Sequence, residues 1–103
     1  MPASAFKHEL FSQFARVGKA LSNANRLEIL DFLAQGEHSV EALAKACELS
    51  VANTSQHLQQ LRQTGLVAAR KEGQLVYYRL VGDGVVDLVG TLRKVAENTL
   101  ADV

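Results

Sequence analysis

The sequence predicts a mainly α-helical fold with a small β-hairpin: five helices plus a two-stranded wing-like pair, in a single domain over residues 1–103. Three observations support this prediction. Apolar residues recur every three or four positions through most of the chain, which is the period of an α-helix. Residues 66–80 change to a strand-like pattern around a glycine. Residues typical of helix caps and helix ends divide the helical part into separate elements.

The first two helices follow from this periodicity. Helical spacing over about residues 4–20 connects Phe6, Leu10, Phe14, Val17 and Leu21. Phe11 falls on a different side, and a second apolar surface on a terminal helix usually faces a partner. The next helix begins after Asn23 or Asn25, either of which can act as its N-cap, and ends at Gly36.

Two more helices form a compact unit. Ser39 can cap a short helix with an apolar stripe that ends at Cys47. After a three-residue break, Ser50 can cap a longer helix that ends at Gly65. A short helix, a tight turn and a longer helix are the outline of a helix-turn-helix.

The segment that follows predicts a hairpin. Residues 66–71 and 74–80 are strand-like and are joined through Glu72-Gly73, where an acidic residue before glycine favours a tight turn. A hairpin directly after a helix-turn-helix is a wing, so we expect a winged helix-turn-helix. The last helix, from about residue 85 to residue 100, is apolar over more than one narrow stripe.

The charges are balanced overall but segregated along the chain. Eleven Lys and Arg residues face eleven Asp and Glu residues, so the sequence is not that of a strongly basic nucleic-acid-binding protein. Residues 50–80 nevertheless carry four cations against one carboxylate, a surplus of three positive charges. Residues 31–48 carry four carboxylates against one cation. We therefore expect a nucleic acid to bind along residues 50–80.

Several classes of protein are excluded or disfavoured. The single cysteine, Cys47, excludes an internal disulfide and a multi-thiolate metal site within one chain. No apolar run approaches a membrane span and the first residues lack a signal-peptide core, so we expect a cytoplasmic protein without a membrane partner. No nucleophile–base pair, glycine-rich phosphate loop or paired carboxylates appear, so we expect neither enzyme activity nor a cofactor.

The helix over residues 51–63 carries the strongest functional signal. At 100° per residue, the side expected to pack on the domain carries Val51, Thr54, Leu58 and Leu61. The opposite side and its flanks hold small residues, amides and hydroxyls: Ala52, Asn53, Ser55, Gln56, Gln59, Gln60 and Gln63. Glutamine and asparagine can pair bidentately with adenine, so this side is typical of base recognition. The alternative is a merely polar surface.

Other candidates for DNA contact lie outside that face. Arg70, Lys71 and Gln74 flank the wing turn, where they can reach phosphates or the minor groove; the alternative is an ordinary solvated hairpin tip. His57 is either a half-buried structural residue or a phosphate or base contact. The full set of DNA-binding candidates is Arg26, Ser50, Asn53, Ser55, Gln56, His57, Gln59, Gln60, Arg70, Lys71 and Gln74.

These segments resemble the ArsR family of small dimeric winged-helix repressors of bacteria, which are often metal-responsive. The resemblance rests on residues 25–30, 49–61, 65–67 and 76–80, and it covers essentially residues 6–100. It implies a homodimer joined by the first and last helices, with one recognition helix per subunit in the major groove of double-stranded DNA. The apolar pattern independently predicts that a monomer would expose Phe6, Phe14, Leu88, Leu92 and Val95.

The sequence departs from the metal-sensing relatives. They often carry Cys-Val-Cys where residues 39–41 read Ser-Val-Glu. Others use Asp and His on the last helix, which offers here Asp83, Asp87 and Glu97 but no histidine. Since zinc prefers Cys and His and softer metals prefer thiolates, the chain resembles the branch that has lost these sites, and we expect no bound metal.

Three functions remain open. The first is a dimeric repressor of a partly palindromic operator, released by a small-molecule or thiol-reactive inducer; Cys47 is then either a buried core residue or the sensor. The second is the DNA-binding module of a longer protein with a C-terminal rhodanese-like domain. The third is a winged helix used for protein–protein interaction, for which the neutral net charge is the best argument.

Overall fold

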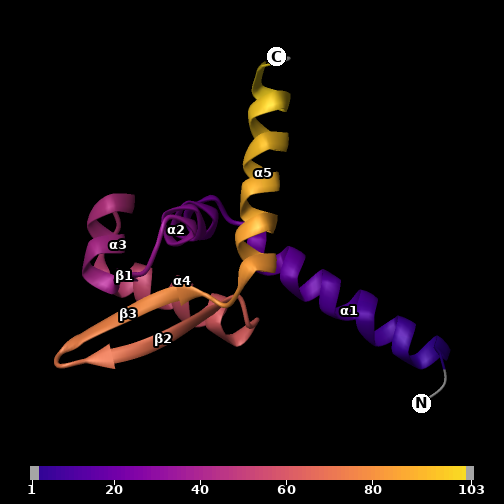
Figure 1. The fold of residues 1–103 in the computed structure, drawn as a ribbon, viewed down its shortest axis with the longest axis horizontal. Coiled ribbons are helices and arrows are strands. Elements are labelled where there is room, and N and C mark those ends of the chain that lie inside the picture. The colour runs from indigo at the N-terminus through magenta and orange to yellow at the C-terminus, as the bar shows by residue number, and fades with distance from the viewer. Residues whose placement is uncertain (1–2, 102–103) are drawn as a thin grey trace.

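A computed structural model describes residues 3–101 and confirms the mainly helical prediction (Figure 1). The elements in chain order are α1 (Ala3–Leu21), α2 (Ala24–Ala34), β1 (His38–Ser39), α3 (Val40–Cys47), α4 (Val51–Gln63), β2 (Val67–Glu72), β3 (Leu75–Leu80) and α5 (Asp83–Ala101). Within that range there are five helices, as expected, and one small sheet. None of these helices is long and apolar enough to cross a membrane.

The helices start at the predicted caps. The side-chain oxygens of Asn23, Ser39 and Ser50 each accept a hydrogen bond from the backbone amide three residues ahead, at 3.0, 3.1 and 3.0 Å. Of the two asparagines proposed for α2, Asn23 is therefore the cap. These bonds satisfy amides that the first helical turn leaves unpaired. Gly65, with φ of 85°, follows α4 in the left-handed region that favours glycine.

The prediction of two strands was wrong by one strand. The antiparallel sheet has the order β1-β3-β2, and β1 pairs His38 with Tyr78 and Ser39 with Tyr77. A two-residue strand is too short to show an alternating pattern, and its partner is about forty residues further along the chain. The sequence therefore carries no local signal for β1.

The wing turn lies one residue later than expected. Glu72 pairs with Leu75 in the β2–β3 register, so the two-residue loop is Gly73-Gln74 rather than Glu72-Gly73. Gly73 has φ of 62°, which confirms the need for positive φ that the glycine indicated. Gln74 is thereby placed at the tip of the wing.

One hydrophobic core holds α2, α3, α4 and the sheet together. Its fully buried members are Ile29, Leu30, Leu43, Thr54, Leu58 and Leu61. Thr54, Leu58 and Leu61 form the expected packed side of α4. Val51 does not belong to it and stays 49% exposed, because it is the first residue of α4 and the buried side begins one turn later.

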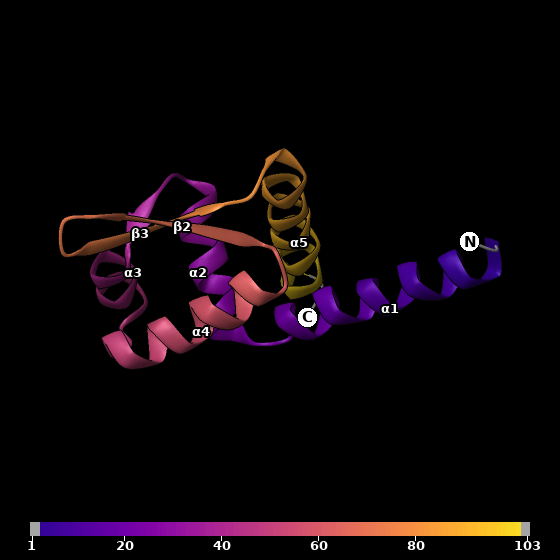
Figure 2. The same ribbon diagram turned by 90° about the horizontal axis from the view of Figure 1, so that it is seen from below.

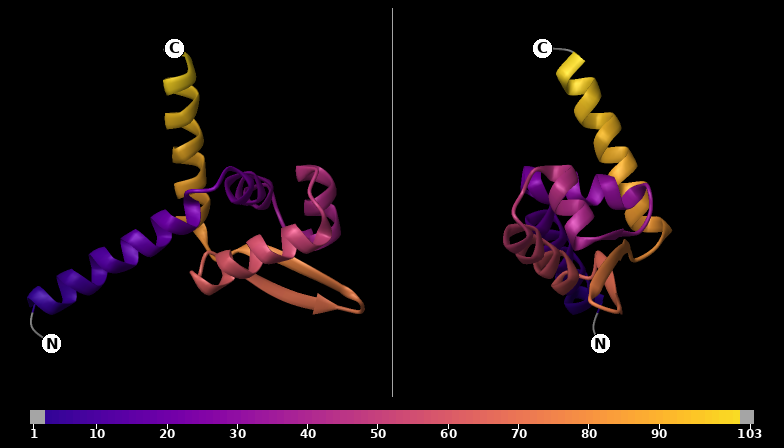
Figure 3. Two further views of the ribbon diagram at one scale, coloured as in Figure 1. Left: turned by 180° about the vertical axis from the view of Figure 1, so that it is seen from behind. Right: turned by 90° about the vertical axis from the view of Figure 1, so that its left-hand side faces the viewer.

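The two terminal helices, α1 and α5, project away from the other elements (Figures 1 and 3). They add only Ala20 and Val89 to the buried residues of the core. Phe6, Phe14, Leu92 and Val95 are exposed as expected, whereas Leu88 is half-buried. Most of the apolar surface of α1 and α5 is thus not covered within one chain.

Candidate nucleic-acid interface

The helix α4 lies along one edge of the body (Figure 2), and most residues of its polar side are exposed. Among the predicted contacts, Asn53, Gln56, Gln59 and Gln60 are exposed and Ser55 is half-buried. Ala52 and Gln63 are exposed on the same side. The structure therefore brings these side chains together on one accessible surface without any carboxylate from α4, which we call the amide face.

A buried hydroxyl fixes the orientation of this helix. Thr54 is fully buried, and its Oγ1 donates a hydrogen bond to the Ser50 carbonyl oxygen at 2.9 Å. A polar group inside a core is tolerated when it is hydrogen-bonded. The core side of α4 is therefore fixed by Thr54, Leu58 and Leu61, and the amide face points outward as a consequence.

His57 lies at the border between these two sides and is half-buried. Burial lowers the pKa of His57, and the nearby positive charge of Arg26 lowers it further. Its imidazole is therefore neutral at neutral pH, when it can both donate and accept a hydrogen bond. Both the structural and the DNA-contacting interpretation of His57 remain open.

Arg26 connects three parts of the chain. Its Nε donates to the Ala20 carbonyl at 2.6 Å, its Nη2 to the Lys19 carbonyl at 3.2 Å and its Nη1 to Oε1 of Gln60 at 3.1 Å. The first two acceptors are carbonyls in the last turn of α1, and the Lys19 carbonyl also accepts hydrogen bonds from the amide and the hydroxyl of Ser22. Arg26 thus ties the end of α1 to α4. The sequence pattern did not indicate this role, because Gln60 is 34 residues away.

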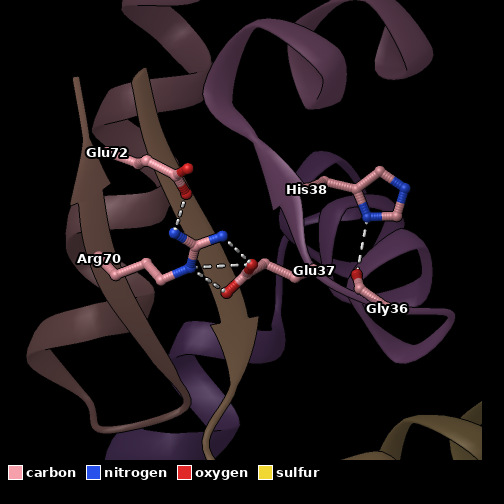
Figure 4. A network of polar contacts seen from close by, with 5 residues as sticks. All are labelled: Gly36, Glu37, His38, Arg70 and Glu72. Atoms are coloured by element: carbon pink, nitrogen blue, oxygen red, sulfur yellow. Dashed lines mark hydrogen bonds and ion pairs between the residues drawn. The ribbon is translucent and has the colours of Figure 1, made fainter. Parts of the chain in front are cut away.

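The wing carries a second arginine with partners (Figure 4). The Arg70 guanidinium binds Glu37 through Nε at 3.0 Å and Nη2 at 2.7 Å, and binds Glu72 through Nη1. It also lies 4.6 Å from the centre of the Tyr77 ring. The hydrogen bond from Arg70 lowers the pKa of Glu37. Lys71, by contrast, is exposed, and no carboxylate within residues 3–101 pairs with it.

Cys47 lies in the core at the end of α3, with 7% of its surface exposed. Burial, with a smaller contribution from the charge of Glu28, raises the pKa of the Cys47 thiol to about 11. The thiol is therefore protonated at neutral pH. Only the thiolate is a strong nucleophile, so this environment disfavours rapid reaction.

The metal-binding positions of the sensing relatives carry other roles here. Ser39 caps α3, and Glu97 lies within 3.7 Å of Arg93 on the same helix. Across the described range, residues 3–101, no three His, Cys, Asp or Glu side chains are grouped closely enough to hold a metal ion. The expected absence of a metal site stays a prediction.

Comparison with known proteins identifies the family. A model for the bacterial regulatory proteins of the arsR family matches residues 23–69, which contain α2, α3 and α4. The chain is also 40% identical over 91 residues to the nodulation protein NolR of Rhizobium meliloti, covering 88% of this chain and 75% of NolR. The chain belongs to the ArsR family.

Other ArsR-family relatives agree with this assignment. The HTH-type transcriptional regulator Rv0324 of Mycobacterium tuberculosis is 50% identical over 97 residues, which cover 94% of this chain but only 43% of Rv0324. This chain therefore spans less than half the length of that relative. The transcriptional activator HlyU of Vibrio cholerae is 43% identical over 76 residues, covering 74% of this chain and 70% of HlyU. These names are those of regulators, which points to a non-enzyme.

A solved ArsR-type structure has the same fold over nearly the whole chain. The homodimeric winged helix-turn-helix DNA-binding domain of Mb0332 from Mycobacterium bovis superimposes with a TM-score of 0.86 at 47% identity. It covers 94% of this chain and 90% of the Mb0332 domain. This likeness confirms the winged helix-turn-helix fold.

Proposed function

We propose that this ArsR-family chain is a repressor that binds a partly palindromic operator as a homodimer. The observation that carries the proposal is the amide face of α4, which is exposed, free of carboxylates and held outward by a buried core side. Amides and small residues on such a face suit hydrogen bonds to base edges in the major groove. The wing, with Lys71 and Gln74 exposed at its end, adds contacts to the DNA backbone or the minor groove.

Dimer formation is supported by the uncovered apolar surface of the terminal helices. Phe11 and Phe14 are 55% and 56% exposed, and Val95 is 55% exposed. Phe11 and Phe14 contact each other on α1, and exposed apolar clusters on a small protein mark interaction surfaces. A two-fold interface through α1 and α5 would cover this surface and would place the two α4 helices about 34 Å apart, one DNA turn. The similar Mb0332 domain is homodimeric.

Release from DNA requires an inducer with a preference between dimer geometries. A ligand that binds both dimer geometries with equal affinity does not shift the equilibrium between them, however tightly it binds. We propose that such an inducer acts by changing the angle between the subunits. Cys47 is the only thiol available to a thiol-reactive inducer, although its burial and raised pKa favour the structural role.

A second candidate function is that of a DNA-binding module in a longer protein. The observation that favours it is the length of Rv0324, of which this chain matches 43%. A C-terminal regulatory part, such as a rhodanese-like domain, would then receive the signal. A winged helix for protein–protein interaction is the third candidate, and the carboxylate-free amide face speaks against it.

The test is fluorescence anisotropy with labelled promoter duplexes and a random duplex over a range of salt concentrations. Binding should weaken steeply with salt because phosphate contacts release counterions. Gln56→Ala should reduce the difference between promoter and random duplexes, corresponding to about 1–3 kcal/mol per lost base contact. Lys71→Gln should weaken both duplexes alike. Absence of salt-sensitive binding would favour the protein-binding alternative.

A further inference from the structure

A polar groove of about 510 Å³ lies beside the amide face, where the C-terminal end of α1 and the beginning of α2 meet the C-terminal half of α4. Its lining residues are Gln13, Arg16, Lys19, Ala20, Arg26, Gln60, Gln63 and Thr64. Three of them are cations and three carry side-chain amides, while none carries a carboxylate. Such a lining offers many hydrogen-bond donors and a positive potential, which suits an anion.

The cations of this groove keep their charge available. Arg16 donates through Nη1 to the neutral amide oxygen of Gln13 at 3.2 Å, and Arg26 donates to carbonyl and amide oxygens. Within residues 3–101, no carboxylate forms an ion pair with Arg16, Lys19 or Arg26. Arg70 and Arg93 differ, because carboxylates already neutralise them.

Arg26 also gives the groove a defined shape. It uses three of its five N–H donors on Ala20, Lys19 and Gln60, and so fixes the end of α1 against α4. The exposed cations that remain free to bind an anion are therefore Arg16 and Lys19, which this contact holds beside α4. A site made of fixed elements loses less entropy on binding than one made of mobile side chains.

The position of the groove matches the edge of the DNA major groove. With 13 residues, α4 is about 20 Å long at 1.5 Å per residue, whereas the major groove is only about 12 Å wide. If the first turns of α4 contact base edges and the helix is inclined across the major groove, its C-terminal end approaches the phosphate backbone. Gln63 belongs to both the amide face and the groove lining, so the two surfaces are continuous.

A dimer formed through the phenylalanines of α1 leaves the groove open. At 100° per residue, Arg16 lies about 140° from Phe11 and about 160° from Phe14 around the helix. Arg16 therefore lies on the opposite side of α1 from these two rings. Lys19 lies about 80° from Phe11 and about 140° from Phe14, on the flank between the two sides. One helix can serve both the partner subunit and the DNA.

We infer that Arg16 and Lys19 form a phosphate-binding site for the DNA backbone, distinct from the amide face and the wing. This inference rests on the proposed DNA-binding function and adds a third contact region to each subunit. A dimer would then make four further phosphate contacts through these two residues. Each contact adds about −0.9 to the slope of log K against log salt concentration.

The test compares the wild type with the double variant Arg16→Gln/Lys19→Gln by anisotropy on promoter and random duplexes. We expect at least tenfold weaker binding to both duplexes and a salt slope less steep by about three to four. Lys7→Gln is the matched control, because it removes a cation from α1 outside the groove, and it should leave the slope unchanged. The charge-preserving variant Arg16→Lys/Lys19→Arg should retain the wild-type slope.

The outcomes separate this inference from the function on which it rests. Sedimentation and circular dichroism must first give the same dimer and helix content for each variant. If the wild type binds DNA in a salt-sensitive way and the double variant has the same salt slope, the phosphate site is overturned but the proposed function is not. Absence of salt-sensitive binding by the wild type would overturn both proposals. A loss confined to the promoter duplex would show sequence reading instead of phosphate contact.

Discussion

The Arg70 guanidinium is shared between Glu37 and Glu72, and this pairing limits the positive charge on the surface of the wing. Glu37 lies in the segment before β1, so a carboxylate outside the hairpin holds the side chain of Arg70 on β2. The contact is exposed to solvent, where ion pairs contribute little to stability. Its contribution to folding is therefore small.

We predict that Glu37→Gln strengthens DNA binding. The change removes one carboxylate per subunit and frees Nε and Nη2 of Arg70 for a phosphate, while Nη1 stays bound to Glu72. The salt slope should therefore become steeper by about one to two in a dimer. Anisotropy on a random duplex measures this. Glu28→Gln, which removes a carboxylate from α2, is the control. Equal or weaker binding by Glu37→Gln would contradict the prediction.

The lowered pKa of Glu37 also predicts a pH dependence. A carboxyl with a folded-state pKa below its unfolded value stabilises the fold above the unfolded pKa, and this contribution disappears as the pH falls through the folded pKa. Urea unfolding of the wild type and Glu37→Gln should therefore differ slightly at neutral pH and converge in acid. A difference that grows in acid would show that Arg70 is not the cause.

Cys47 should react slowly in the folded protein. Burial raises the pKa of the Cys47 thiol from 9.0 to about 11, which lowers the thiolate fraction at neutral pH about 100-fold. A chromogenic disulfide reagent should thus modify the native protein at least a hundredfold more slowly than the urea-unfolded protein. Polysulfide, peroxide and arsenite should release DNA equally from the wild type and Cys47→Ser. Release that depends on Cys47 would establish it as the sensor.

At the scale of elements, α4 serves two purposes with its two sides. Thr54, Leu58 and Leu61 pack into the core, and the amide face remains in water. The residues that pack into the core are different from the residues that are exposed on the amide face, so each set can change independently. Changes on one side should therefore leave the other intact.

We predict that Leu58→Ala destabilises the fold without acting on base recognition. Leu58 is fully buried, and truncation of such a leucine costs about 2–5 kcal/mol of unfolding free energy. Gln59→Ala, on the exposed side, should change stability by no more than about 0.5 kcal/mol. Urea unfolding at a fixed protein concentration measures both, since a dimer's stability depends on concentration. Similar losses in the two variants would contradict the assigned sides.

At the scale of the whole molecule, the two terminal helices project from the winged body and expose apolar surface (Figure 1). An ion pair between Arg93 and Asp31 holds α5 against α2, while α1 is tied to the body through Arg26. An apolar hollow of about 350 Å³ lies between α2 and α5. Packing against the rest of the chain therefore leaves many apolar residues of α1 and α5 exposed.

We predict that Phe11→Gln/Phe14→Gln converts the protein to monomers. The two rings contact each other edge to face at 5.1 Å and are exposed in one chain. Their loss should shift the sedimentation profile towards the monomer at micromolar concentration and weaken operator binding by more than tenfold, because half-sites are then bound singly. Val81→Gln, at another exposed apolar residue, should stay dimeric. If the double variant stays dimeric, the subunit interface does not depend on Phe11 and Phe14.

The sequence by itself indicated the five helices, the serine caps of α3 and α4, the hairpin of the wing and the family. Those features have local signals: a cap needs Ser or Asn beside a helix start, and Gly73 marks the turn through its positive φ. The amide face of α4 was also predicted, since 100° per residue separates it from Thr54 and Leu58.

Only the tertiary structure decided which charges remain free. Arg70 and Arg26 resemble one another in the sequence, yet one meets Glu37 across 33 residues and the other meets Gln60 across 34. The strand β1 and the groove around Arg16 and Lys19 likewise join segments that are distant in the chain. Residue spacing reports neighbours within one element, whereas these contacts arise when separate elements pack together.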